Sequence, residues 1–219
     1  MATETGRWAA ATAFVAEQDA AMAEVVERVG PCTLVRRRHP GGYFAALARA
    51  VVYQQLAGRA AAAIHARFVA IFDGRPRAEA VLSAPDEELR GAGLSAAKVA
   101  TIKDLAAKVV DGSMRLGGLG RLPDDEIVRR LCEVRGIGRW TAEMFLVFQL
   151  NRPDVWPVGD FGVRSGFARV HGLRELPSPA ELGVLGERFR PYRTVAAWYC
   201  WRAMDPPRPT LSTRPRPKW

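Results

Sequence analysis

The chain has 219 residues, of which 48% are hydrophobic, and this composition excludes a protein that stays unfolded in solution. Its 32 lysines and arginines outnumber its 23 acidic residues, for a net charge of +9, which favours a polyanionic partner such as nucleic acid. The N-terminus lacks a basic start followed by an apolar core, and no apolar run reaches about 18 residues, so we expect a cytoplasmic protein without a membrane span.

Apolar residues recur at helical spacing along the chain and no convincing strand pattern is present, so we predict an all-α fold. A first helix is expected over 12–29, and Gly30 with the proline after it ends that helix. Ser95 is a good N-cap for a later helix, and Asp124 or Asp125 for another. The further predicted helices cover 43–72 with a break at 54–58, a short segment after 84–86 that ends at 91–93, the segment from 95 through 109, the segment from 124 to glycines at 136–138, 140–150, the segment from 160 onward, 179–189 and 194–204.

These helices are expected to form two lobes. One lobe covers 43–158, and the other combines the N-terminal helix within 1–42 with residues 159–205. A cleft between two such lobes is a common place for an active site. The Pro/Arg-rich tail, residues 206–219, has too few apolar residues to fold and is predicted to be disordered.

Two glycines flank one aliphatic residue in the segment Gly136-Ile137-Gly138, between two predicted helices. Glycines permit a tight turn that other residues would obstruct, and Ile137 would pack back between the helices. The second helix then begins at the turn, so its free backbone N–H groups face outward as a phosphate site, with the charge of Arg139 beside it. The alternative is an ordinary helix corner in which glycine serves as a C-cap.

A carboxylate follows this hairpin, at Asp160 in the segment PVGDFGVRSG. From the residues alone, Asp160 could be the N-cap of a helix, a functional carboxylate or both, whereas the rival acid Asp154 is expected on a solvated loop. The hairpin segment LxxVxGIGRWTA followed by PVGDFGVRSG resembles the signature of the helix-hairpin-helix superfamily of base-excision DNA glycosylases. Within that superfamily the chain looks most like the DNA-3-methyladenine glycosylase II type, from Phe14 to Met204.

The resemblance implies a helix-hairpin-helix glycosylase fold with the active site between the two lobes. It also implies a monomeric, monofunctional enzyme that flips alkylated purines, of the 3-methyladenine or 7-methylguanine kind, from duplex DNA and hydrolyses the N-glycosidic bond. Asp160 would be the catalytic carboxylate, because a fixed negative charge stabilises the positive charge that develops on the deoxyribose. Two alternatives stay open: the same chemistry on hypoxanthine, etheno-adenine or a deaminated base, and a non-catalytic DNA-binding protein.

This chain lacks two sets of residues that carry chemistry in other members of the superfamily. Members with lyase activity carry a lysine in the hairpin helix, and Trp140 stands at that position, so we expect no lyase activity. Iron–sulfur members carry four clustered cysteines, whereas Cys200 stands alone. We therefore expect no cofactor and no metal site, apart from a weakly held monovalent cation at the hairpin carbonyls. Only the segment 1–42 precedes the helical core, which resembles compact members without an N-terminal β-rich domain.

The resemblance also assigns a base pocket to Trp140, Trp201, Tyr199 and Met144. An indole face attracts a cationic alkylated base by roughly 0.5–2 kcal/mol. Core packing is the alternative for any one of these aromatic residues, and either Trp198 or Tyr199 is expected to face the core. Met144 replaces an aromatic residue of some relatives, which leaves the range of bases open.

The break at 54–58 resembles the loop that wedges into DNA. Leu56 would fill the gap left by the flipped base, and Gln55 would lie against the opposite strand. The alternative is that Leu56 is a buried residue of a helix corner. The residues predicted to contact DNA are therefore Gln55, Leu56, Gly136, Ile137, Gly138, Arg139 and Thr141.

Overall fold

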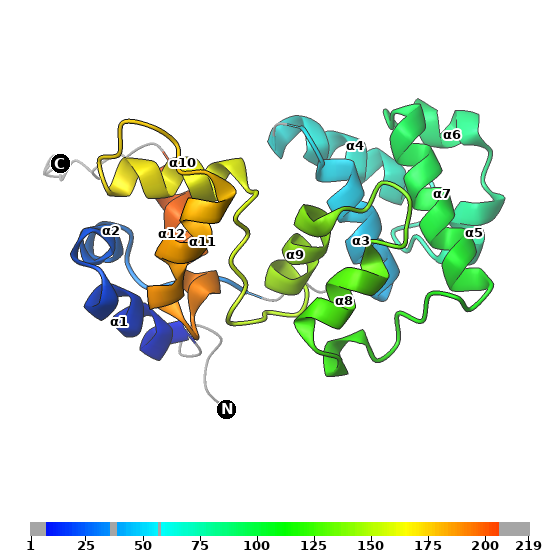
Figure 1. The fold of residues 1–219 in the computed structure, drawn as a ribbon. Helices are drawn as coiled ribbons and strands as arrows, with labels where there is room; N and C mark the ends of the chain where they lie inside the picture. The colour runs from blue at the N-terminus through cyan, green and yellow to red at the C-terminus, as the bar shows by residue number, and fades with distance from the viewer. Residues whose placement is uncertain (1–7, 36–38, 57, 206–219) are drawn as a thin grey trace, which may run out of the picture.

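The computed structural model describes residues 8–35, 39–56 and 58–205, and all regular elements in these ranges are helices, as the sequence predicts (Figure 1). No helix in the described ranges is long and apolar enough to cross a membrane. The helices are α1 (Ala9–Gln18), α2 (Ala20–Val29), α3 (Gly42–Tyr53), α4 (Gly58–Ala70), α5 (Ala78–Ser83), α6 (Asp86–Gly91), α7 (Ala96–Val110), α8 (Asp124–Leu131), α9 (Arg139–Phe148), α10 (Phe161–Val170), α11 (Pro179–Gly186) and α12 (Arg193–Ala203), with short 3-10 helices η2 (Leu119–Arg121) and η3 (Glu187–Phe189).

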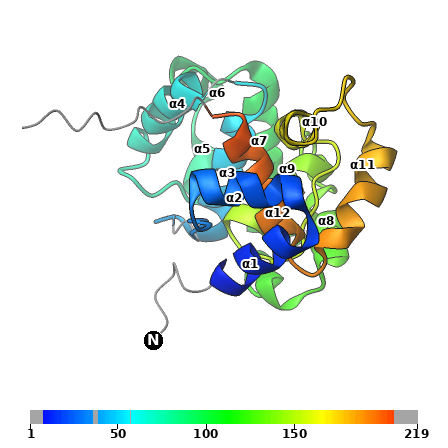
Figure 2. The same cartoon turned by 90° about the vertical axis from the view of Figure 1, so that its left-hand side faces the viewer.

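The helices gather in two groups (Figure 1). In the first group, α12 packs against α1, α2 and α10, and Figure 2 shows α1 and α2 in front of α12. In the second group, α7 packs against α3 and α5, and α9 packs against α3 and α8. The segment after α9 leads from the second group back to the first, where α10 begins (Figure 1). This crossing places the start of α10 beside the hairpin helix α9.

The expected single helix over 12–29 is wrong at one point, because Asp19 separates α1 from α2. The backbone of Asp19 is extended, at φ −156° and ψ 114°, and its Oδ1 accepts a hydrogen bond from the N–H of Met22 at 3.0 Å. Its Oδ2 lies 2.9 Å from Nε2 of His171 and accepts a bond from Arg188 at 3.1 Å. Burial raises the pKa of Asp19, but these hydrogen bonds and charges outweigh it and lower the pKa overall. The break thus joins the N-terminal helices to α10 and η3.

Two other helix predictions also need correction. The helix α5 lies where the sequence predicts none, and α8 has no side-chain cap. Asp124 and Asp125 instead lie inside the first turn of α8, where acidic groups favour the positive end of the helix dipole. Asp124 also pairs with Arg152 at 3.0 Å. Ser95, in contrast, is the N-cap of α7 as predicted.

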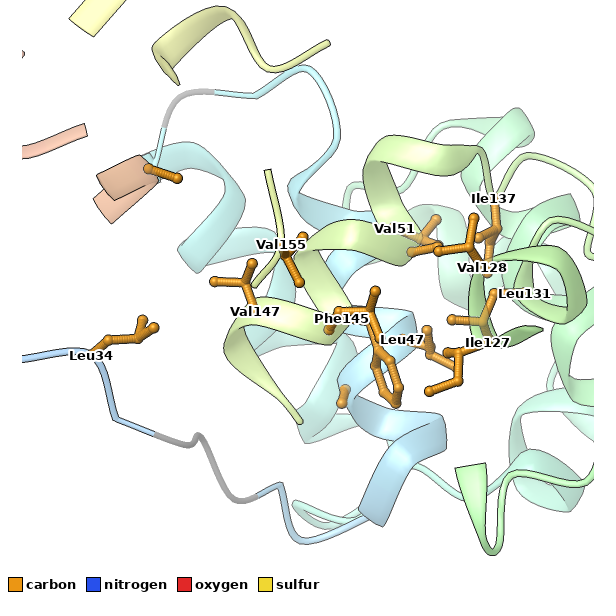
Figure 3. Packing of buried hydrophobic residues seen from close by; sticks show 14 of the residues in the cluster. Leu34, Leu47, Val51, Ile127, Val128, Leu131, Ile137, Phe145, Val147 and Val155 are labelled. Atoms are coloured by element: carbon orange, nitrogen blue, oxygen red, sulfur yellow. The ribbon is translucent and has the colours of Figure 1, made fainter. Parts of the chain in front are cut away.

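The core beneath the hairpin is apolar. Figure 3 shows Ile137 turned toward Val51 and Val128, and Leu131 lies close to Ile127. Ile137 is 3% exposed, which confirms that it packs back between the helices. Burial of such a side chain stabilises the fold by about 1.5–3 kcal/mol, so the turn is held in place by the core below it.

Candidate active site

Asp160 precedes α10, and three N–H groups hold its carboxylate. Oδ1 accepts hydrogen bonds from the backbone N–H of Val163 and from Nε1 of Trp201, both at 2.8 Å. Oδ2 accepts a hydrogen bond from Nε1 of Trp140 at 2.6 Å. Asp160 is therefore the N-cap of α10, and side chains from α9 and α12 fix the orientation of the same carboxylate.

Two residues that the sequence analysis missed shape the surroundings of Trp201. A Cβ atom at Gly162 would lie 2.9 Å from Cδ1 of Trp201 and 3.1 Å from Oδ1 of Asp160, so a glycine lets the indole approach the carboxylate. The Trp201 ring stacks on Phe148, with centroids 5.5 Å and planes 24° apart. The spacing of four residues from Trp140 to Met144 and again to Phe148 is the sequence signal that could have identified this shared face of α9.

Trp140 lies in the walls of two cavities. The larger cavity, of about 490 Å³, also contains Asp160 and is bounded by both groups of helices. The smaller cavity, of about 300 Å³, has mostly apolar and aromatic walls. The lining of the larger cavity is Gln54, Gln55, Gly136, Trp140, Thr141, Gly159, Asp160, Phe161 and Gly162. The lining of the smaller one is His39, Ala46, Arg49, Ala50, Tyr53, Trp140, Met144, Phe145, Phe148 and Gln149.

The structure brings together three of the four predicted pocket residues. Trp140 and Met144 line the smaller cavity, and Trp201 reaches the carboxylate. Tyr199 lies elsewhere, which corrects its assignment: its side chain is fully buried and its hydroxyl donates to the carbonyl of Gly30 at 2.9 Å. Residues two apart on a helix point in nearly opposite directions, so α12 cannot turn both Tyr199 and Trp201 toward the site.

A single side chain joins the hairpin to the loop at 54–58. Nε2 of Gln54 donates to the carbonyl of Gly136 at 3.1 Å and to Oγ1 of Thr141 at 2.8 Å. The side chain of Thr141 is buried and positions Gln54, so the predicted DNA contact of this residue would come from its backbone N–H in the first turn of α9. Lys98 donates to the carbonyls of Val52 and Gln54, at 2.8 and 2.9 Å, and holds the end of α3.

Gln55 and Leu56, which follow Gln54, are both exposed. Gln55 has a φ of 54°, in the left-handed region, which costs a non-glycine residue about 1–3 kcal/mol, and the surrounding structure must offset this cost. Leu56 is 38% exposed, so the alternative of a buried helix-corner residue is wrong. Gln55 lines the cavity that contains Asp160. The loop therefore presents one polar and one apolar side chain at the mouth of the site.

The N-terminus of α9 carries an exposed arginine. Arg139 follows Gly138, the N-cap residue, and no side chain in the described part of the protein caps this helix. The Arg139 side chain is 68% exposed, and its Nε donates to Oε1 of buried Glu143 at 2.9 Å. Burial raises the pKa of Glu143, the charge of Asp160 adds to this effect, and Arg139 opposes it. Glu143 was not predicted from the sequence, although its i,i+4 spacing from Arg139 indicates such a pair.

Asp154, the rival acid, is bound away from the cavities. Its carboxylate accepts hydrogen bonds from Nε of Arg193 at 2.7 Å and from Nη1 of Arg190 at 2.8 Å. It is therefore part of an ion-pair network, which corrects the prediction of a solvated loop. Asp154 does not line the larger cavity, whereas Asp160 does.

Comparison with known proteins places this site in a family. The family described as HhH-GPD superfamily base excision DNA repair protein matches residues 48–190, well over half of the chain. The chain belongs to the HhH-GPD superfamily. The HhH-GPD match contains the 54–58 loop, the hairpin and Asp160, whereas Trp201 lies beyond its end. The fold of α12 against α10 brings Trp201 into hydrogen-bond contact with the carboxylate of Asp160.

Similar HhH-GPD proteins include a relative from Schizosaccharomyces pombe named DNA-3-methyladenine glycosylase 1, which is 37% identical over 173 residues that cover 78% of this chain and 76% of the relative. A solved structure of the 3-methyladenine DNA glycosylase of that yeast in complex with abasic DNA has a TM-score of 0.83 and 34% identity, and the match covers 88% of this chain and 95% of that one. A DNA-3-methyladenine glycosidase from Bacillus halodurans has a TM-score of 0.75 and 32% identity, covering 88% of each chain.

Proposed function

We propose that this HhH-GPD protein is a monofunctional DNA glycosylase that releases alkylated purines, of the 3-methyladenine and 7-methylguanine kind, from duplex DNA. The observation that carries the proposal is the carboxylate of Asp160, fixed by the indole N–H groups of Trp140 and Trp201 in the wall of a cavity beside the hairpin. The names of the similar proteins support the same chemistry.

The proposed reaction breaks the bond between the base and C1′ of the deoxyribose. Positive charge develops on the sugar as the base departs, and the carboxylate of Asp160 stabilises that charge. The same carboxylate can orient the water that attacks C1′ and accept its proton. An alkylated purine is already a good leaving group, so the reaction needs no second acid.

The proposed reaction ends with base release. A lyase needs an amine that attacks the sugar, and Trp140 occupies the position of that amine in the hairpin helix. The lysines in the described part of the chain all lie on α7 and are engaged there: Lys98 with backbone carbonyls, and Lys103 and Lys108 with aspartates. None of them lines either cavity.

Duplex DNA is the proposed partner, and we expect the protein to bind it as a monomer. The backbone N–H groups at the start of α9 would hold a phosphate, with the exposed guanidinium of Arg139 beside them. Ion pairing with phosphates releases counterions, so affinity should fall as salt rises. Leu56 would enter the gap left by the flipped base, and Gln55 would lie against the opposite strand.

A monovalent cation at the hairpin carbonyls stays a prediction. The carbonyls of Val134 and Gly136 each accept one hydrogen bond, from the N–H of Ile137 at 3.0 Å and from Gln54 at 3.1 Å. A carbonyl oxygen has a second lone pair, so both can still coordinate a cation. Such an ion would add positive charge at the phosphate site and take no part in the chemistry. Within the described ranges, no cluster of three or more His, Cys, Asp or Glu side chains could hold a metal ion.

Duplexes of one sequence, each with a single damaged base, test the proposal. We expect release of methylated purines as free bases, and strand breaks at the resulting abasic sites only after treatment with alkali. Faster release of hypoxanthine or etheno-adenine would show that the protein is a glycosylase with a different substrate from the one proposed. Binding without release from any duplex would favour the non-catalytic alternative, and strand breakage without alkali would refute a monofunctional enzyme.

The variant Leu56→Ala tests the wedge. We expect the rate of base release from a duplex to fall about tenfold, because the unstacking of a base costs a few kcal/mol that the leucine partly offsets. The melting temperature should stay the same, since Leu56 is exposed. Release from a single-stranded substrate is the control, because no helix has to be opened there. An equal loss on single and double strands would show that Leu56 has another role.

A further inference from the structure

The smaller cavity is lined by a glutamine whose side-chain oxygen has no hydrogen-bond partner. Gln149 is the C-cap residue of α9 and lines this cavity. The residue is 6% exposed, and its Oε1, which has almost no accessible surface, accepts no hydrogen bond from any residue that the structure describes. A buried polar group in this state costs about 1–3 kcal/mol, so it is rarely retained without a reason. The backbone N–H of Gln149 is satisfied by the carbonyl of Phe145, so the side chain alone lacks a partner.

The walls of this cavity suit a flat ring. Trp140, Phe145 and Phe148 contribute aromatic surfaces, and Met144 adds an adaptable apolar side chain. Its volume of about 300 Å³ is at the lower end for ligand sites, as expected for one heterocycle and not a larger molecule. Trp140 also borders the cavity of Asp160, so the two cavities share this indole as a wall.

We infer that Gln149 recognises the hydrogen-bonding edge of the extruded base, so that the cavity selects purines with an N–H donor next to an acceptor. This inference rests on the proposed function and names its substrate class. A side-chain amide presents an acceptor oxygen and a donor NH₂ group side by side, which is the complement of such an edge. Methylated adenine and guanine keep this edge. Etheno-adenine lacks the donor, because its additional ring joins both nitrogens.

A fixed positive charge in the same cavity makes a hydrogen bond more important for selection. The guanidinium carbon of Arg49 lies 3.9 Å from the centroid of the Tyr53 ring, and both residues line the cavity. This charge opposes the attraction of a cationic base to Trp140. Burial, followed by Arg49, lowers the pKa of nearby His65 to about 4, so that histidine adds no second charge at neutral pH. Selection by the charge of the base is therefore weakened.

The variant Gln149→Leu tests this inference on duplexes that carry either 7-methylguanine or etheno-adenine. We expect kcat/KM for 7-methylguanine to fall at least about tenfold, whereas kcat/KM for etheno-adenine is unchanged or rises. The melting temperature should be unchanged or higher, because the variant removes an unpaired buried amide. Met144→Leu is the matched control: it lies on the same helix and in the same cavity, changes no polar atom, and should alter both rates by the same factor.

Other outcomes overturn the inference. An equal fall for both lesions, or a lower melting temperature, would show that Gln149 is a packing residue. An unchanged ratio of the two rates would refute the inference and leave the proposed function intact. Failure of the wild type to release any base would overturn both. If Gln149→Leu does not fold, Gln149→Met keeps the unbranched shape without the amide and should give the same change in ratio.

Discussion

Asparagine in place of Asp160 should lower the rate of base release from a methylated duplex about 10²–10³-fold. The variant removes the negative charge that stabilises the sugar in the transition state. It also replaces the acceptor oxygen Oδ2 by an NH₂ group, which then faces the N–H of Trp140 in place of accepting from it. Single-turnover assays with excess protein measure the chemical step directly.

The fold and DNA binding should survive this substitution. Asparagine is as good an N-cap as aspartate, so the bond from Val163 and the start of α10 are retained. Asp154→Asn is the matched control: it weakens the ion pairs with Arg190 and Arg193, lowers the melting temperature and leaves the rate of base release unchanged. Equal rates for Asp160→Asn and the wild type would remove Asp160 from the mechanism.

The variant Gly136→Ala should weaken the hairpin and DNA binding together. Gly136 has a φ of 80°, which costs other residues about 1–3 kcal/mol. An added Cβ would also overlap Oγ1 of Thr101 and lie 3.2 Å from its Cβ, and such overpacking costs a further ~1–3 kcal/mol. Urea denaturation should therefore show a lower free energy of unfolding, and affinity for duplex DNA should fall because the phosphate site moves.

Two further variants separate the causes of this effect. Gly138→Ala is the control in the same turn, since Gly138 has a φ of −95° and open space around it, so the added Cβ meets neither strain nor overlap, and only the weaker N-cap costs about 0.5–1.5 kcal/mol. In the double variant with Thr101→Ala, the overlap is relieved but the unfavourable φ remains. We therefore expect partial recovery of stability, and full stability of Gly136→Ala alone would contradict the geometry of the turn.

The sequence by itself determined the features that depend on local backbone geometry. The glycines of the hairpin, the N-caps at Ser95 and Asp160 and the break after α3 were all predictable, because caps and tight turns require particular residues at particular positions. The burial of Ile137 was predictable for a related reason, since the helices that flank such a turn must cover an apolar residue between them.

Only the tertiary structure decided which side chains meet over long distances. Periodicity could not tell whether α12 turns Tyr199 or Trp201 toward Asp160, because three of the four residues from Trp198 to Trp201 are aromatic, and Trp198 is also buried. The break at Asp19 depends on partners in α10 and η3, which no local pattern reveals. The unpaired amide of Gln149 is likewise visible only once its surroundings are known, because hydrogen-bond satisfaction is a property of the folded neighbourhood and not of the residue type.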